Sequence, residues 1–146
     1  MRVRCVSRDG SAYPEEVLDP RVNRTRESRW PLTVGREYVV QAVTVETGMF
    51  WYYLIDDDGF SYPTWYCAAA FEISDARPSS NWVVGYHPYP HRPHGVGASV
   101  LAFREWADDP HFYERLYDDD PAAVEVFDRE RRFTELEDAE RNGPLG

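Results

Sequence analysis

The chain of 146 residues contains no lysine, so all 16 of its cations are arginines, and they face 26 acidic residues. No apolar run approaches the ~20 residues that a membrane-spanning helix needs, and the N-terminus lacks the apolar stretch of a signal peptide. These absences predict a cytoplasmic protein that contacts no membrane. Catalytic patterns are missing too: there is no Ser-His-Asp or Cys-His arrangement, glycine-rich phosphate loop or C-x-x-C pair. We therefore expect no enzyme activity and no cofactor.

Positive charge is scarce after residue 36. Residues 1–36 contain eight arginines and five acids, whereas the remainder contains eight arginines and 21 acids. The formal net charge of the whole chain is −10. Because an acidic surface repels phosphate groups, this excess argues against nucleic acids and anionic membranes as partners. It favours a basic protein partner instead.

Cysteine is scarce as well. The two cysteines, Cys5 and Cys67, both lie in apolar, strand-like contexts. For a cytosolic protein this pattern predicts two buried thiols, and the alternative is a redox or nucleophilic role. Around Cys5 the apolar residues alternate with Arg2 and Arg4, which predicts a half-buried strand with both arginines on the solvent face.

The stretch from residue 35 to 75 holds most of the β-forming residues. Two turn signals, Thr47-Gly48 and Asp58-Gly59, divide it. With the N-terminal segment, five short strands are expected, at residues 2–7, 37–45, 49–56, 61–66 and 71–73. Trp82–Val84 could add one more strand or anchor the chain across the barrel. Short strands joined by tight turns are typical of a small antiparallel β-barrel. The strand at 49–56 is apolar on both faces, so another layer must cover the outside of the barrel.

Residues 11–33 have little periodicity and contain three prolines. Tyr13–Leu18 could form one helical turn, with Pro14 at its first position. The arginines that follow predict a solvated basic loop, at Arg21, Arg24, Arg26 and Arg29. A loop of this length is often mobile or functional, and we favour a mobile one.

The last third of the chain has helical patterns. Apolar residues recur at helical spacing between residues 97 and 107, at Val100, Leu101, Phe103, Trp106 and Ala107. Asp109-Pro110 and Asp120-Pro121 each combine an N-cap acid with a proline at the first helical position. They predict a short helix at 110–117 and a longer one at 121–133, which together can cover the strand at 49–56.

These patterns predict an α+β protein in two parts. Residues 1–96 form the barrel with its N-terminal strand and long loop. Residues 97–146 form helices that pack on the barrel, with a frayed tail from about residue 134.

Two groups of candidate binding residues lie around the second turn. Asp56, Asp57 and Asp58 could bind a cation, act as paired carboxylates of an enzyme, or form a solvated hairpin tip. Aromatic residues on the neighbouring strands could line a groove for an extended peptide, or fill the core. They are Tyr52, Tyr53, Tyr62, Trp65 and Tyr66.

Two further candidates lie outside the barrel strands. The acidic helices could imitate a phosphate backbone for a basic partner, or present an ordinary solvated face; their acids include Asp118, Asp119, Asp120, Glu125, Asp128 and Glu130. His87, His91 and His94 could ligate zinc with His111 or an aspartate. Because the prolines between them hold the backbone extended, an exposed linker is the alternative, and no metal site is assigned.

Several segments resemble those of a group of small bacterial proteins of uncharacterised function with an SH3-like barrel. The matching segments are Leu32-Thr33-Val34-Gly35-Arg36-Glu37-Tyr38, Tyr53-Leu54-Ile55-Asp56-Asp57-Asp58-Gly59, Trp65-Tyr66, Phe71-Glu72, Ser79-Ser80-Asn81-Trp82 and Asp109-Pro110-His111-Phe112-Tyr113-Glu114-Arg115-Leu116. The resemblance covers most of the chain and implies an SH3-like barrel with C-terminal helices, but it implies no activity. Compact acidic proteins of this kind are similar to immunity proteins of bacterial toxin systems.

The sequence therefore favours a non-enzymatic protein-binding module. Its most concrete form is an immunity-type inhibitor of a basic bacterial toxin, which binds through the acidic and aromatic candidates. The alternative is a regulatory protein that binds a small ligand or a metal through the histidine segment.

Overall fold

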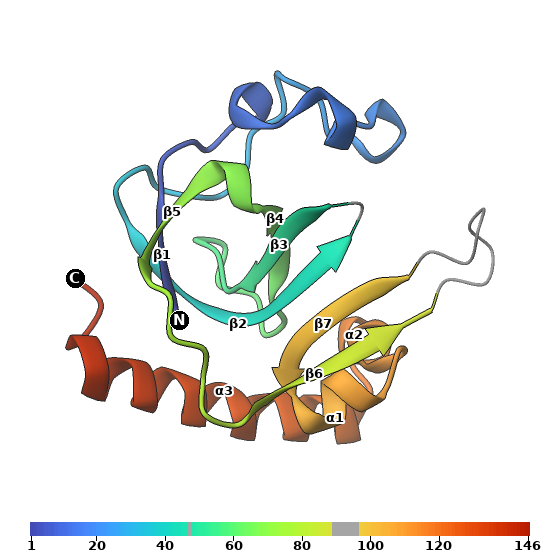
Figure 1. Cartoon of the computed structure of the whole chain (residues 1–146), viewed down its shortest axis with the longest axis vertical. Coiled ribbons are helices and arrows are strands. Elements are labelled where there is room, and N and C mark those ends of the chain that lie inside the picture. Colours follow the sequence, from blue (N-terminus) through green and yellow to red (C-terminus); the bar gives the residue numbers. More distant parts are fainter. Residues whose placement is uncertain (47, 89–96) are drawn as a thin grey trace.

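A computed structural model describes residues 1–46, 48–88 and 97–146. These residues form one antiparallel sheet of seven strands and three α-helices (Figure 1). The strands are β1 (Arg2–Cys5), β2 (Glu37–Glu46), β3 (Met49–Leu54), β4 (Thr64–Cys67), β5 (Phe71–Asp75), β6 (Trp82–His87) and β7 (Ala98–Phe103). The helices are α1 (Arg104–Asp108), α2 (Phe112–Tyr117) and α3 (Pro121–Asn142). The predicted α+β class is confirmed.

The ten-residue strand β2 organises the sheet. One of its edges pairs with β3, and its other edge is shared by β1 and β7. Val3 of β1 lies opposite Tyr38, and Val100 of β7 lies opposite Thr44. Between these two regions the register with β3 shifts, between Val40 and Ala42, and such a bulge bends a strand. Figure 1 shows the β1–β5 pair and the β6–β7 pair diverging along the two halves of β2.

The sheet is open among the described residues. The strand order is β4-β3-β2-β1-β5, and its two end strands, β4 and β5, are not paired with each other. The five strands predicted between residues 2 and 73 are present in the predicted order, although β4 begins later than expected, at Thr64. A closed barrel stays a prediction.

The structure corrects one element. Residues 98–103, predicted to be helical, form strand β7, which pairs along its whole length with β6. Ala98, Val100 and Ala102 are buried at every second position, which is the period of a strand. The apolar residues of this segment fit the spacing of a helix as well as that of a strand, and for this reason the helix prediction was wrong. The boundary expected at residue 96 therefore falls between two paired strands.

The helices cover β3 as predicted. The Tyr53 ring meets the Trp106 ring of α1 with centroids 4.9 Å apart and the Tyr113 ring of α2 at 5.0 Å, both edge to face. A second buried cluster lies between the sheet and these helices, around Phe112 and Phe127. The outer layer therefore supplies the cover that the apolar strand requires. No helix among the described residues has the length and apolarity to cross a membrane.

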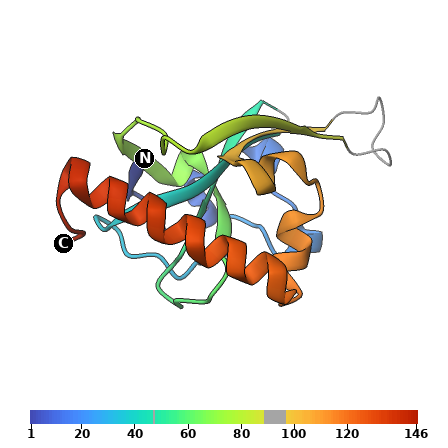
Figure 2. The same cartoon turned by 90° about the horizontal axis from the view of Figure 1, so that it is seen from below.

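Helix α3 lies across the outer side of the sheet (Figure 2). It begins as predicted: the side chain of Asp120 accepts hydrogen bonds from the backbone N–H groups of Ala122 and Ala123 at 2.9 and 3.2 Å. The sequence predicts fraying from about residue 134, but the helix continues to Asn142. Buried polar side chains on its last turns, which include Thr134, hold it against the sheet.

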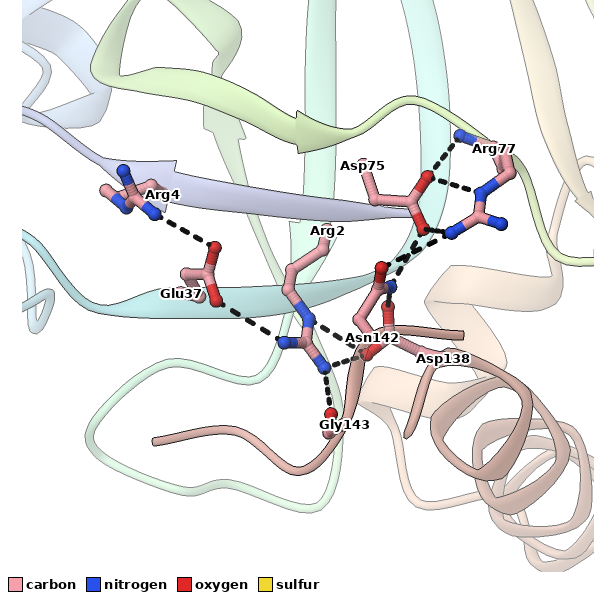
Figure 3. A network of polar contacts seen from close by, with 8 residues as sticks. All are labelled: Arg2, Arg4, Glu37, Asp75, Arg77, Asp138, Asn142 and Gly143. Carbon is pink, nitrogen blue, oxygen red and sulfur yellow. Dashed lines mark hydrogen bonds and ion pairs between the residues drawn. The ribbon is translucent and has the colours of Figure 1, made fainter. Parts of the chain in front are cut away.

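One of these contacts is a buried ion pair (Figure 3). Arg2 donates from Nε and Nη2 to Oδ2 of Asp138 at 3.0 and 2.5 Å, and Nη2 also donates to the Gly143 carbonyl at 2.7 Å. The Arg2 side chain is 5% exposed and that of Asp138 2%. The prediction that Arg2 faces solvent is wrong because α3 covers this end of β1. Arg4 is half-exposed, as expected, and donates to Glu37.

The long segment between β1 and β2 is structured. It contains three short 3-10 helices, at Gly10–Ala12, Glu15–Val17 and Pro20–Val22, and the second lies where a helical turn was expected. Tyr13 anchors the segment: its ring stacks on Trp30 at 4.4 Å, and its oxygen accepts a hydrogen bond from the Cys67 N–H at 3.0 Å. Cys5 and Cys67 are both buried and unbridged, as predicted.

Candidate functional site

The connection between β3 and β4 turns at Asp56–Gly59. The Gly59 N–H donates to the Asp56 carbonyl at 3.1 Å, and Gly59 has a φ of 69°, which glycine adopts readily. The Asp56 carboxylate is buried, where it accepts hydrogen bonds from the Tyr66 hydroxyl at 2.6 Å and the Asp58 N–H at 3.1 Å. Burial and this bond to Asp56 raise the pKa of Tyr66.

Asp56 and Tyr66 belong to the predicted partner-binding set, but in the structure they bind each other. Both side chains are buried, and the hydroxyl of Tyr66 donates a hydrogen bond to the carboxylate of Asp56. The sequence correctly indicates a turn at this point. It gives no sign that a tyrosine ten residues away donates to the first aspartate of the turn.

Asp57 is engaged in holding a neighbouring turn. Its carboxylate accepts from the Thr33 hydroxyl at 2.6 Å, the Arg36 guanidinium at 2.8 Å and the Tyr38 hydroxyl at 2.8 Å. Burial is the main cause that raises the pKa of Tyr38 to about 12. Three donors on one carboxylate leave little capacity for a cation, so the geometry does not favour the cation hypothesis. Asp58 is exposed.

Three aromatic rings meet beside this turn. Phe60 stacks on Tyr62 with centroids 5.5 Å apart, and Tyr62 meets Tyr117 of α2 edge to face at 5.1 Å. Phe60 is 51% exposed and Tyr117 57%. Exposed rings in mutual contact form a contiguous apolar patch, and large patches of this kind mark interaction sites. Of the three, the sequence prediction includes only Tyr62 as a binding residue.

Three carboxylates lie close to these rings in the chain. Asp58 precedes Phe60, while Asp118 and Asp119 follow Tyr117 in the turn between α2 and α3, and all three acids are exposed. Asp119 has a left-handed conformation, with a φ of 57°, which aspartate tolerates better than most residues. Within the described residues, neither Asp118 nor Asp119 forms an ion pair. We call these six residues the aromatic–acidic surface: Asp58, Phe60, Tyr62, Tyr117, Asp118 and Asp119.

The remaining acidic candidates have different positions. The side chain of Asp120 caps α3, and its Oδ2 lies 3.8 Å from Nη1 of Arg115. This side chain therefore stabilises the start of the helix. Glu125 is exposed and Asp128 half-buried on the following turns of α3. They extend the acidic character of the surface along the helix.

Trp65 lies elsewhere. Its ring, 40% exposed, meets Trp51 edge to face at 5.1 Å, and it lines a hollow under the N-terminal segment rather than the aromatic–acidic surface. Tyr52 and Tyr53 pack in the two cores. The predicted aromatic groove is therefore divided between the core, the hollow and the aromatic–acidic surface.

The structure describes one of the three histidines in the candidate zinc segment. His87 is buried, and its Nε2 lies 3.0 Å from the Ala107 carbonyl oxygen, while His91 and His94 lie outside the described residues. Among the described residues, no three histidine, cysteine or acidic side chains are grouped to hold a metal. Zinc binding by this segment stays a prediction.

Comparisons with protein-family models, with curated proteins and with solved structures found no match for this chain.

Proposed function

We propose that the protein is a non-enzymatic protein-binding module and that its aromatic–acidic surface binds a basic protein. One observation carries the proposal: the Tyr62 ring contacts the rings of Phe60 and Tyr117, and both of these are more than half exposed. Tyrosine and other aromatic residues are enriched at the centres of protein interfaces, where they carry much of the binding energy.

Charge supports a basic partner. Asp58, Asp118 and Asp119 are exposed around the rings, and the whole chain has a net charge of −10. Charges at the rim of an interface accelerate association with a partner of opposite sign and select against partners of the same sign. In its most concrete form the proposal is an immunity-type inhibitor of a bacterial toxin, such as a basic nuclease.

The SH3-like barrel is part of the same proposal. The order β5-β1-β2-β3-β4, the long segment after β1 and the 3-10 helix Ala68–Ala70 between β4 and β5 are consistent with that fold. The fold alone does not determine a function.

Affinity capture tests the proposal. The immobilised protein is incubated with lysate of its source organism at low salt, and the bound proteins are identified and then challenged with high salt. We expect a basic protein that is retained at low salt and weakened at high salt, because screening reduces attraction between exposed charges.

Two variants make the test specific. Tyr117→Ser should weaken binding of that protein at least about 30-fold if the ring is an interface hot spot. Ile73→Ser is the matched control, because Ile73 is 52% exposed on β5 outside the aromatic–acidic surface. Equal retention by wild type and Tyr117→Ser would refute the proposed surface.

A further inference from the structure

A hollow of about 370 Å³ lies between the N-terminal segment and strands β3 and β4. This volume is in the range of small-molecule sites. Five of its lining residues are aromatic: Tyr13, Trp30, Trp51, Trp65 and Tyr66. Several of these rings contact one another, which includes the stacked pair of Tyr13 and Trp30. The walls are therefore ring surfaces held in place by their neighbours.

One arginine enters this aromatic hollow. The guanidinium carbon of Arg24 lies 4.9 Å from the ring centroid of Trp51 and 5.6 Å from that of Trp65. Its Nε donates to the Val17 carbonyl. Within the described part of the chain its two Nη groups have no hydrogen-bond or ion-pair partner. They remain as unused donors beside the rings.

The backbone fixes Arg24 in this position. Its N–H donates to the Asp19 carbonyl at 3.0 Å, and its own carbonyl accepts from the Asp19 N–H at 2.7 Å. These two bonds close the tip of the loop around the 3-10 helix Pro20–Val22, which ends at Asn23 in a left-handed conformation. An arginine held in place before binding loses less conformational entropy when a ligand arrives.

Arg24 supplies the positive charge of the hollow. Asp19 also lines it, but Arg21 donates to the Asp19 carboxylate from Nε and Nη2, both at 3.0 Å. The hydrogen bonds from Arg21 lower the pKa of Asp19, and the nearby charge of Arg24 lowers it further. Within the described residues Arg24 forms no ion pair with Asp19, so its Nη groups stay open to a ligand. The guanidinium of Arg24 already lies over the rings of Trp51 and Trp65. It would repel a cationic ligand that approached these rings, so the site disfavours cations.

We propose that this hollow binds a small ligand that combines a flat ring with a carboxylate or phosphate group. The ring packs against the aromatic walls near Trp30 and Trp65, and the anionic group accepts hydrogen bonds from the Nη groups of Arg24. Guanidinium groups bind carboxylates and phosphates through two parallel hydrogen bonds, and aromatic rings favour offset or edge contacts with another ring. The site is separate from the aromatic–acidic surface and does not depend on the proposed function.

Calorimetric titration with paired probes tests this site. The carboxylate pair is indole-3-acetate and its neutral analogue indole-3-acetamide. The phosphate pair is adenosine 5′-monophosphate and adenosine. For at least one pair we expect saturable binding. The dissociation constant of the anion should be at least about tenfold lower than that of its neutral analogue. The pair that binds more tightly identifies which anionic group the site prefers.

Variants assign the preference to Arg24. Arg24→Met should abolish the difference between anion and neutral analogue, and Arg24→Lys should restore part of it. Arg26→Met is the control, since Arg26 is an exposed arginine on the same loop that does not line the hollow. Trp65→Leu should weaken both members of a pair by a similar factor, because it removes ring contact rather than charge. Circular dichroism confirms that each variant is folded.

Three results would overturn the proposal. One is the absence of saturable binding for all four probes to the wild-type protein. Another is an equal affinity for anion and neutral analogue. The third is an anion preference that Arg24→Met retains.

Discussion

The two ends of α3 carry carboxylates in opposite environments. Near the C-terminal end, Asp138 is buried against Arg2, and Asp75 of β5 accepts hydrogen bonds from Arg77 and Asn142 beside it. Near the N-terminal end, Asp118 and Asp119 are exposed around an aromatic cluster. The first group holds the helix to the sheet, and the second forms no ion pair within the described residues. Charge of the same sign therefore stabilises the fold at one end of the helix and is exposed to solvent at the other.

The largest effect should come from the buried pair. Asp138→Ala leaves Arg2 as an uncompensated buried charge, and we expect the free energy of unfolding to fall by about 3–5 kcal/mol. Urea denaturation measures this loss. The double variant Arg2→Met/Asp138→Leu should be more stable than the single variant, because apolar groups replace both charges. A double variant that is less stable than Asp138→Ala would contradict the assignment of the pair.

Asp75 should show a smaller effect that depends on pH. The hydrogen bond from Arg77, with that from Asn142, lowers the pKa of Asp75 below its ordinary 3.8. A carboxylate with a lowered folded-state pKa stabilises the protein above its unfolded-state pKa, and this stability is lost as the pH falls through the folded-state value. Asp75→Asn should therefore cost about 1–2 kcal/mol at pH 7, and the difference should shrink below pH 4. Urea denaturation at pH 7 and pH 3 checks this, and an equal difference at both values would disprove it.

The helix cap should have a moderate effect. Asp120→Ala removes the acceptor for the N–H groups of Ala122 and Ala123, and we expect a loss of about 1 kcal/mol. Asp120→Asn serves as the control, since asparagine caps helices about as well. Thermal denaturation compares the three proteins, and an equal loss in both variants would show that the charge rather than the cap matters.

The smallest effect on stability is expected at the exposed end. The double variant Asp118→Asn/Asp119→Asn should change the free energy of unfolding by less than about 0.5 kcal/mol, since asparagine also tolerates a left-handed conformation. Association with the proposed basic partner should slow, which stopped-flow mixing at low salt would detect. A loss of stability comparable to that of Asp138→Ala would remove the contrast between the two ends.

Local sequence signals predicted much of the fold. Alternation and turn residues located β1 to β5, and Asp120 with Pro121 placed the start of α3. Residues 98–103 were assigned wrongly because their apolar spacing fits both a helix and a strand, and the partner strand β6 decides between them. The continuation of α3 was missed because its anchor, Arg2, lies 136 residues away from Asp138. Such a pairing leaves no local trace.

The candidate site was predictable only in part. Asp118 and Asp119 are exposed, as the run of acids in the sequence predicts, and their role in binding stays a prediction. Asp56 and Asp57 have hydrogen-bond partners that the sequence does not indicate, because the donors come from Tyr66 and Tyr38, in other strands. The cluster of Phe60 with Tyr62 and Tyr117 arises where a β-turn meets a helix end, a contact that neither segment reveals alone.

The division of β2 between two partners has a consequence for any fragment of this protein. Strand β1 covers one half of an edge of β2, and β7 covers the other half. A fragment that stops after β6 would leave the second half of that edge without a neighbour, and a bare strand edge is a template for self-association. Such a fragment should aggregate rather than fold, because strands from the N-terminal and C-terminal portions are both needed to cover this edge of β2.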